Sequence, residues 1–149
     1  EICEQMQGRV DGIAIGAGTG GTFTGVAKFL KEHCGKVHCA LVESQASVYG
    51  GGKSGDHNVE GIGASFIPSV CDMKLVDEVI TVSDREAFAM VRELAVKEGV
   101  LGGSSSGAAV VAAIRLAKKL GPGKRVVTII PDSAERYLSK DIFNFKEFS

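Results

Sequence analysis

The glycine-rich segment near the start of the chain has the composition of an anion-binding loop and reads Gly16-Ala17-Gly18-Thr19-Gly20-Gly21-Thr22. It follows a short apolar segment and precedes an amphipathic one, which places it between an expected strand and an expected helix. Glycines let successive backbone N–H groups turn toward one point, and the first turn of a helix adds partial positive charge. The motif therefore predicts a phosphate site.

Two kinds of phosphate compound fit this loop. Its glycines satisfy the G-x-G-x-x-G pattern of dinucleotide-binding proteins, and Glu43 stands near the end of the next expected strand, where an acid would bind a ribose. Thr19 and Thr22 favour a terminal phosphate monoester instead, because their hydroxyl groups suit a ligand with more oxygens to satisfy. The loop alone leaves both interpretations open.

A second motif, Gly103-Ser104-Ser105-Ser106-Gly107, matches the G-x-S-x-G turn that presents the nucleophile of serine hydrolases. Such an enzyme needs a histidine later in the chain than the serine, whereas His33, His38 and His57 all precede it. Two interpretations remain. The serines form the N-cap region of a helix, or one hydroxyl is presented to a ligand at the ends of the strands.

Cysteine and histidine residues offer a possible metal site. The chain has no CxxC pair, and we expect its four cysteines, Cys3, Cys34, Cys39 and Cys71, to be reduced thiols in a cytosolic protein. His33-Cys34 and His38-Cys39 bring four possible ligands close together in the sequence. The intervening Gly35-Lys36 predicts a turn from a helix into a strand, and zinc sites usually use two separated ligand pairs. We therefore expect no metal.

The segments around these motifs alternate between strand and helix patterns. Apolar runs predict buried strands at residues 11–16, 37–42, 78–82 and 125–130. Helices are expected at residues 22–32, 84–98 and 108–120, and Ser83 with Glu86 forms a capping box at the start of the second. This alternation predicts an α/β fold, a three-layer domain with a mainly parallel sheet.

Length and composition set the class of protein. The chain has 149 residues, enough for one domain, and its 44% hydrophobic and 23% charged residues are typical of a globular protein. A net charge of −1 gives no electrostatic footprint for nucleic acid or an anionic membrane. No apolar run approaches the ~20 residues that span a bilayer, and the first residues do not resemble a signal peptide. We expect a cytoplasmic protein.

Four motifs, in this order, resemble those of the fold-type II pyridoxal-phosphate enzymes, the group of cysteine synthase and cystathionine β-synthase. Residues 18–26 resemble the phosphate-binding loop and residues 59–68 the substrate-side segment. Residues 104–108 resemble the segment whose serine meets the cofactor ring, and residues 131–139 the C-terminal signature. The resemblance extends from residue 1 to about residue 140 and implies a fold shared with one domain of a two-domain enzyme.

The resemblance implies pyridoxal 5'-phosphate as the cofactor and assigns roles to individual residues. Its phosphate would be held by Gly18, Thr19, Gly20, Gly21 and Thr22. Ser105 would hydrogen-bond the pyridine nitrogen, and Asp132 would lie near the same edge of the ring. Glu60, Gly61 and Gly63 would lie on the substrate side. A neutral hydroxyl partner leaves the ring nitrogen largely unprotonated, which makes the ring a moderate electron sink.

The implied reaction is β-replacement on serine, O-acetylserine or cysteine in sulfur amino-acid metabolism, with small amino-acid substrates and a homodimeric enzyme. Glu60 and the tripeptide Pro131-Asp132-Ser133 resemble cystathionine β-synthases. The length of the loop at residues 44–58 resembles cysteine synthases instead. The two activities therefore stay open.

The Schiff-base lysine of the family would lie upstream of anything in this chain. We therefore expect residues 1–149 to be the large cofactor-phosphate-binding domain, with no catalytic residue of its own and without activity in isolation. Two other functions remain as alternatives. One is a dinucleotide-binding oxidoreductase domain, and the other is a non-catalytic binding module made of half an enzyme.

Overall fold

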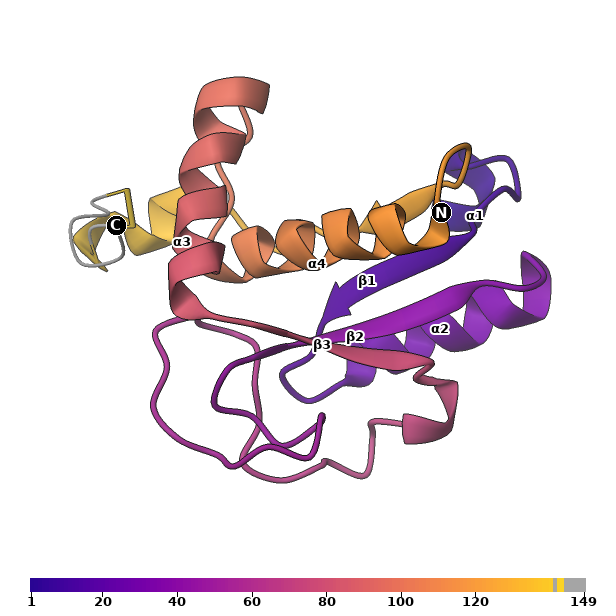
Figure 1. The fold of residues 1–149 in the computed structure, drawn as a ribbon, viewed down its shortest axis with the longest axis horizontal. Helices are drawn as coiled ribbons and strands as arrows, with labels where there is room; N and C mark the ends of the chain where they lie inside the picture. The colour runs from indigo at the N-terminus through magenta and orange to yellow at the C-terminus, as the bar shows by residue number, and fades with distance from the viewer. Residues whose placement is uncertain (141, 144–149) are drawn as a thin grey trace.

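The computed structural model describes residues 1–140, 142 and 143. Its four strands are β1 (Gly12–Gly16), β2 (His38–Ser44), β3 (Glu78–Val82) and β4 (Val126–Thr128). They form one sheet in the order β3-β2-β1-β4, and each neighbouring pair is parallel. The predicted α/β fold with a parallel sheet is confirmed (Figure 1).

The helices cover both faces of the sheet. They are α1 (Ile2–Gln5), α2 (Gly21–His33), α3 (Asp84–Glu93), the π-helical turn η2 (Leu94–Glu98) and α4 (Ser104–Leu120), with 3₁₀ helices η1 (Met73–Leu75) and η3 (Ala134–Lys140). Helix α2 lies on one face, and α3 and α4 lie on the other (Figure 1). The domain therefore has three layers.

The buried residues form one cluster on each face of the sheet, as the alternation of side chains along a strand requires. Ile13 and Ile15 of β1 pack with Phe23 and Leu30 of α2. Ala14, between them in the sequence, faces the opposite cluster, which contains residues of α3 and α4. Continuous apolar sequence in β1 is thus explained by burial on both faces.

The local helix signals in the sequence are partly confirmed. Ser83 Oγ accepts a hydrogen bond from Glu86 N at 3.4 Å, and the Glu86 carboxylate accepts one from Ser83 N at 3.2 Å, so the capping box is present. Helix α4, however, begins at Ser104 rather than at Ala108. The serine-rich segment was expected before the helix, but it forms the first turn of α4.

The cysteine prediction is wrong for one pair. Cys3 of α1 and Cys34, just after α2, form a disulfide, because α1 packs beside the end of α2 and brings their Cα atoms to 6.5 Å. Cys39 and Cys71 are free and buried. His38 pairs with Glu78, and no group of three metal-ligating side chains occurs in the described part of the chain.

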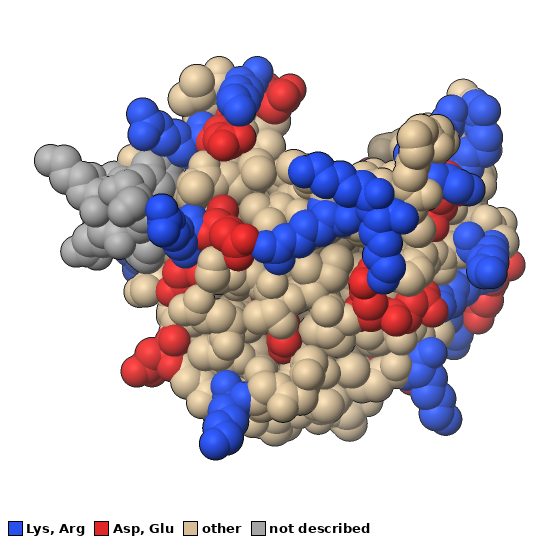
Figure 2. All heavy atoms as spheres, in the orientation of Figure 1, with Lys and Arg blue, Asp and Glu red and all other residues tan. Residues whose placement is uncertain are grey.

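The surface carries charges of both signs. On the face shown in Figure 2, basic side chains gather over α4 with acidic side chains beside them. Arg115 of α4 pairs with Glu86, and Lys119 pairs with Glu78, so these charges tie α4 to α3 and to the β3 edge. No helix within residues 1–140 is long and apolar enough to cross a membrane.

Candidate functional site

The carboxyl ends of β1 and β4 open into a cavity of about 590 Å³. The chain leaves β1 for β2 on one side, whereas β4 pairs with β1 on the other side, so the strand order reverses here. In open α/β sheets, ligands bind in the crevice outside the strands at such a switch point. Gly16 and Ile15 at the end of β1, and Ile129, Pro131 and Asp132 after β4, line this cavity.

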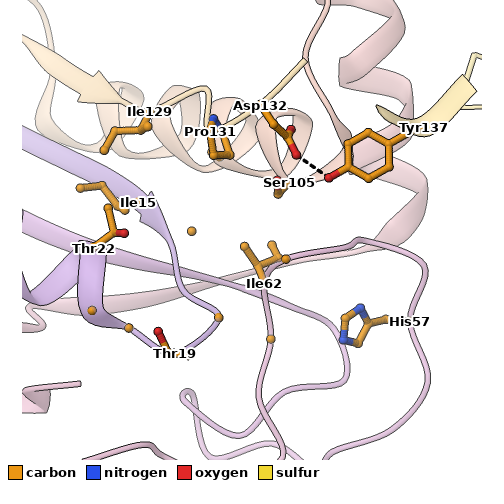
Figure 3. A pocket seen from close by; sticks show the side chains of 17 residues that line it. Ile15, Thr19, Thr22, His57, Ile62, Ser105, Ile129, Pro131, Asp132 and Tyr137 are labelled. Carbon is orange, nitrogen blue, oxygen red and sulfur yellow. Dashed lines mark hydrogen bonds between the residues drawn. The ribbon is translucent and has the colours of Figure 1, made fainter. Parts of the chain in front are cut away.

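The glycine loop between β1 and α2 forms one wall of the cavity. Gly20, the N-cap of α2, has φ = +80°, and a Cβ atom there would lie 2.5 Å from the Cys71 side chain. A Cβ atom on Gly18 would lie 2.7 Å from the Gly61 carbonyl oxygen. Both positions therefore require glycine. Thr19 and Thr22 line the same wall and lie on the side of the cavity opposite Ser105 (Figure 3).

A buried tyrosine supports this loop from behind. Tyr49, only 5% exposed, donates its hydroxyl hydrogen to the carbonyl oxygen of Gly18 at 2.7 Å. Burial raises the pKa of the Tyr49 hydroxyl to about 12. The hydroxyl therefore remains protonated, and a donor to the Gly18 carbonyl oxygen, at neutral pH.

The three serines at the start of α4 have different surroundings. Ser104 Oγ accepts a hydrogen bond from Glu60 N at 3.0 Å, which ties the helix to the substrate-side segment. Ser106 Oγ is buried without a hydrogen-bond partner among the described residues. Ser105, 5% exposed, lines the cavity. Of these three serines, Ser105 is the one among the lining residues of the cavity.

Asp132 and Tyr137 lie next to Ser105 on the wall opposite the glycine loop (Figure 3). The Tyr137 hydroxyl donates a hydrogen bond to Asp132 Oδ2. That bond and burial raise the pKa of Tyr137 to about 12. Asp132 Oδ1 is buried and has no partner in the described structure. Both side chains pack against Gly103, where a Cβ atom would lie 2.5 Å from Asp132 Oδ1.

The substrate-side segment closes the cavity from the third side. Gly61 has φ = +82°, and Gly63 has φ = +91°, conformations that favour glycine. A Cβ atom on Gly63 would lie 2.3 Å from Ser44 Oγ and 3.0 Å from His57 Nε2. His57 and Ile62 line the cavity as well.

The predicted site residues come together with one exception. The glycine loop, Ser105, Asp132, Gly61 and Gly63 all line the cavity. Glu60 is not among the lining residues described, and its carboxylate accepts a hydrogen bond from Lys140 in η3.

Sequence reasoning missed several lining residues: Ile15, His57, Ile62, Ala109, Ile129, Pro131 and Tyr137. Ile15 and Ile129 had a usable signal, since both stand at the carboxyl ends of predicted parallel strands. Ile62 and Tyr137 lie within residues 59–68 and 131–139, which the resemblance identified as segments without giving these two residues a role. His57 had no signal, because only the course of the loop at residues 44–58 brings it to the cavity.

Glu43 does not take the position that a dinucleotide site would need. It is 2% exposed, it accepts a hydrogen bond from the Thr81 hydroxyl at 2.9 Å, and a second one comes from Gly50 N at 3.3 Å. These two bonds occupy the Glu43 carboxylate. Glu43 is not among the residues that line the cavity in the described structure. This leaves the ribose of a dinucleotide without its acidic partner.

Comparison with known proteins gives a consistent result. A family model described as "Pyridoxal-phosphate dependent enzyme" matches residues 1–132. The chain is 48% identical over 143 residues to an O-acetylserine dependent cystathionine beta-synthase of Bacillus subtilis, covering 96% of this chain and 47% of that protein. It is 43% identical over 149 residues to a cysteine synthase of Staphylococcus aureus, covering 99% and 48%. The chain thus spans about half the length of these curated relatives.

Solved structures agree with these relatives. The crystal structure of an O-acetylserine dependent cystathionine beta-synthase from Helicobacter pylori matches with a TM-score of 0.92 and 44% identity, over 95% of this chain and 46% of that one. A hydrogen sulfide-producing enzyme from Fusobacterium nucleatum matches with a TM-score of 0.88 and 39% identity, over 91% and 46%.

Proposed function

The chain belongs to the family of pyridoxal-phosphate-dependent enzymes, and from this premise we propose that the whole protein catalyses β-replacement on serine, O-acetylserine or cysteine. The relatives named as cysteine synthase and as O-acetylserine dependent cystathionine beta-synthase support this reaction class. No observation of the site favours an oxidoreductase.

The cavity supports pyridoxal phosphate as its ligand. Its glycine loop offers backbone N–H groups and the start of a 13-residue helix to a phosphate. Across the cavity, Ser105 offers one neutral hydroxyl, which can donate a hydrogen bond to a ring atom. A ligand with an anionic group at one end and a polar ring atom at the other matches these two walls.

We assign the following roles to the residues of this chain. Gly18, Thr19, Gly20, Gly21 and Thr22 bind the phosphate, and Ser105 donates a hydrogen bond to the ring nitrogen. Ile15, Ile62 and Ile129 exclude water from the ring, which strengthens the polar interactions around it. When bound, the cofactor supplies an electron sink for negative charge that develops on the substrate. Gly61 and Gly63 let the backbone approach the substrate closely.

Residues 1–149 form the large cofactor-phosphate-binding domain in this proposal. No lysine is among the residues that line the cavity in the described structure. The 149-residue chain alone therefore does not catalyse β-replacement. Incubating it with pyridoxal phosphate, serine and homocysteine, and assaying cystathionine, tests this. The whole protein is proposed to be a cytoplasmic homodimer, which sedimentation and cell fractionation test.

The single observation that carries the proposal is the placement of Ser105 opposite the glycine loop (Figure 3). The test compares the full-length protein with its Ser105→Ala and Ser106→Ala variants. Pyridoxal phosphate binds to all three, but only Ser105→Ala changes the visible absorption of the bound cofactor and the turnover of O-acetylserine. Ser106 is the matched control, because it lies in the same helical turn and faces the core.

Two outcomes would contradict the proposal. Labelling of Ser105 by a serine-directed fluorophosphonate would assign a hydrolase. Tight binding of NAD without binding of pyridoxal phosphate would assign a dinucleotide-binding domain.

A further inference from the structure

The two oxygen atoms of the Asp132 carboxylate have different surroundings. Its Oδ2 atom accepts the hydrogen bond from the Tyr137 hydroxyl. Its Oδ1 atom is buried without a partner among the described residues, although the side chain lines the cavity beside Ser105. The Tyr137 hydroxyl therefore donates the hydrogen bond that holds this carboxylate in the cavity wall.

The position of this carboxylate is set by its neighbours. Gly103 leaves no room for a Cβ atom, which would lie 2.5 Å from both Asp132 Oδ1 and Tyr137 Cε2. Ser133, next to Asp132, forms an antiparallel bridge with Gly102, and Ala134 N donates a hydrogen bond to Leu101 O at 2.9 Å. The segment before α4 thus fixes the backbone at Asp132, and Tyr137 fixes its side chain.

We propose that Tyr137 is a positioning residue: it holds the Asp132 carboxylate in the cavity wall beside Ser105, and its hydroxyl dipole offsets the negative charge that this carboxylate presents to a pyridine nitrogen bound there. The inference rests on the proposed function, because it places the cofactor ring between the two walls. It adds a group, Tyr137, to which neither the motif nor the comparisons give a role.

The physical reason is a balance of charges at the ring edge. A neighbouring carboxylate favours the protonated form of a pyridine nitrogen, whereas a neutral hydroxyl such as that of Ser105 does not. The Tyr137 O–H group points its positive end at Asp132 and weakens the field of the carboxylate at the ring. Tyr137 thus keeps the ring nitrogen nearer to the largely unprotonated state that a neutral partner such as Ser105 favours.

Other charged groups act on this pair. Glu60 raises the pKa of Tyr137 and Arg136 lowers it, and both contribute less than Asp132. Lys140 forms an ion pair with Glu60. His57 lines the same cavity and carries an ionisable side chain, so its contribution is removed by making every comparison in the His57→Gln background as well.

The experiment measures the protonation of the ring nitrogen in the bound cofactor. The full-length protein is loaded with pyridoxal phosphate labelled with ¹⁵N in the ring, and the ¹⁵N chemical shift is recorded from pH 5 to pH 9. Asp132→Asn removes the charge and shifts the protonation midpoint down by about 1 pH unit or more. Tyr137→Phe leaves the charge without its donor and shifts the midpoint up by about 0.5 pH units. The double variant behaves like Asp132→Asn.

Leu138→Ala is the matched control, because Leu138 is exposed on the same 3₁₀ helix, and it leaves the midpoint unchanged. Shifts of the same sign in the two single variants, or no shift in Tyr137→Phe, would overturn the inference and leave the proposed function intact. Failure of the wild-type protein to bind the labelled cofactor would overturn the proposed function, and the inference with it.

Discussion

The hydroxyl of Tyr49 donates its hydrogen to the carbonyl oxygen of Gly18 across 2.7 Å, behind the glycine loop. We predict that Tyr49→Phe destabilises the fold by about 0.5–1.5 kcal/mol, because the hydrogen bond to the half-buried Gly18 residue is lost. It also weakens pyridoxal phosphate binding to the full-length protein, since the loop loses its support. Thermal unfolding and equilibrium dialysis measure the two effects. Unchanged values of both would show that the contact is incidental.

The threonines of α2 allow a direct test of the phosphate site. Thr22→Val should weaken cofactor binding to the full-length protein by about one to two decades, because a charge-assisted hydrogen bond contributes roughly 1.5–3 kcal/mol. Thr24→Val is the control, since the Thr24 hydroxyl accepts from Asp72 N at 3.0 Å, outside the cavity lining. It should lower thermal stability and leave the cofactor dissociation constant nearly unchanged. Equal affinity of Thr22→Val and the wild type would remove Thr22 from the site.

We expect a glycine-to-alanine substitution to have opposite effects on stability at Gly18 and at Gly25. Gly18→Ala places a Cβ atom 2.7 Å from the Gly61 carbonyl oxygen, so two backbone segments must separate, at a cost of about 1–3 kcal/mol. Gly25 lies inside α2 with no atom within 4 Å of a Cβ, so Gly25→Ala should stabilise the protein by about 0.5–1 kcal/mol. Urea denaturation of both variants gives the comparison. Similar stability of the two would mean that the loop and the Gly61 segment are not in close contact.

The chain has two tyrosines and no tryptophan, which makes an alkaline titration easy to interpret. Tyr49 and Tyr137 both have their pKa raised from 10 to about 12, the first mainly by burial and the second mainly by its bond to Asp132. A raised pKa stabilises the fold fully below the unfolded value near 10 and no longer does so once the pH passes 12. We therefore expect little phenolate absorption at 295 nm until pH 11, and falling stability above pH 10. Titration near pH 10 in the folded protein would contradict both contacts.

Glu60 provides a test of the reaction that the whole protein catalyses. If the protein is a cystathionine β-synthase, Glu60→Gln should reduce the use of serine more than the use of O-acetylserine, because hydroxide is the poorer leaving group. The carboxylate would have to leave Lys140 to reach the substrate. Lys140→Met should therefore not reproduce the loss. The measurement is kcat/KM for serine and for O-acetylserine in each variant. Equal losses on both substrates in Glu60→Gln would assign Glu60 a structural role.

Local patterns predicted most of the fold, and contacts distant in sequence account for what they missed. The Ser83 capping box and the strand at residues 78–82 depend on neighbouring residues, and both are present. The turn of Glu60 toward Lys140 depends on a residue 80 positions away. The Cys3–Cys34 disulfide spans 31 residues and follows from the packing of α1 beside α2. No periodicity or motif in the sequence contains this information.

The pairing of β4 with β1 has a consequence for the order in which the protein folds. The Thr128 hydroxyl donates to the Ala14 carbonyl oxygen across a separation of 114 residues, and Lys124 pairs with Asp11 across 113. During synthesis, β1, α2 and β2 leave the ribosome before β4, so one edge of β1 stays unpaired until β4 has emerged. Contacts of such long range slow folding. The ligand cavity, which needs both strand ends, is therefore completed only after β4 has emerged, and a nascent chain exposes the unpaired backbone edge of β1 throughout that delay.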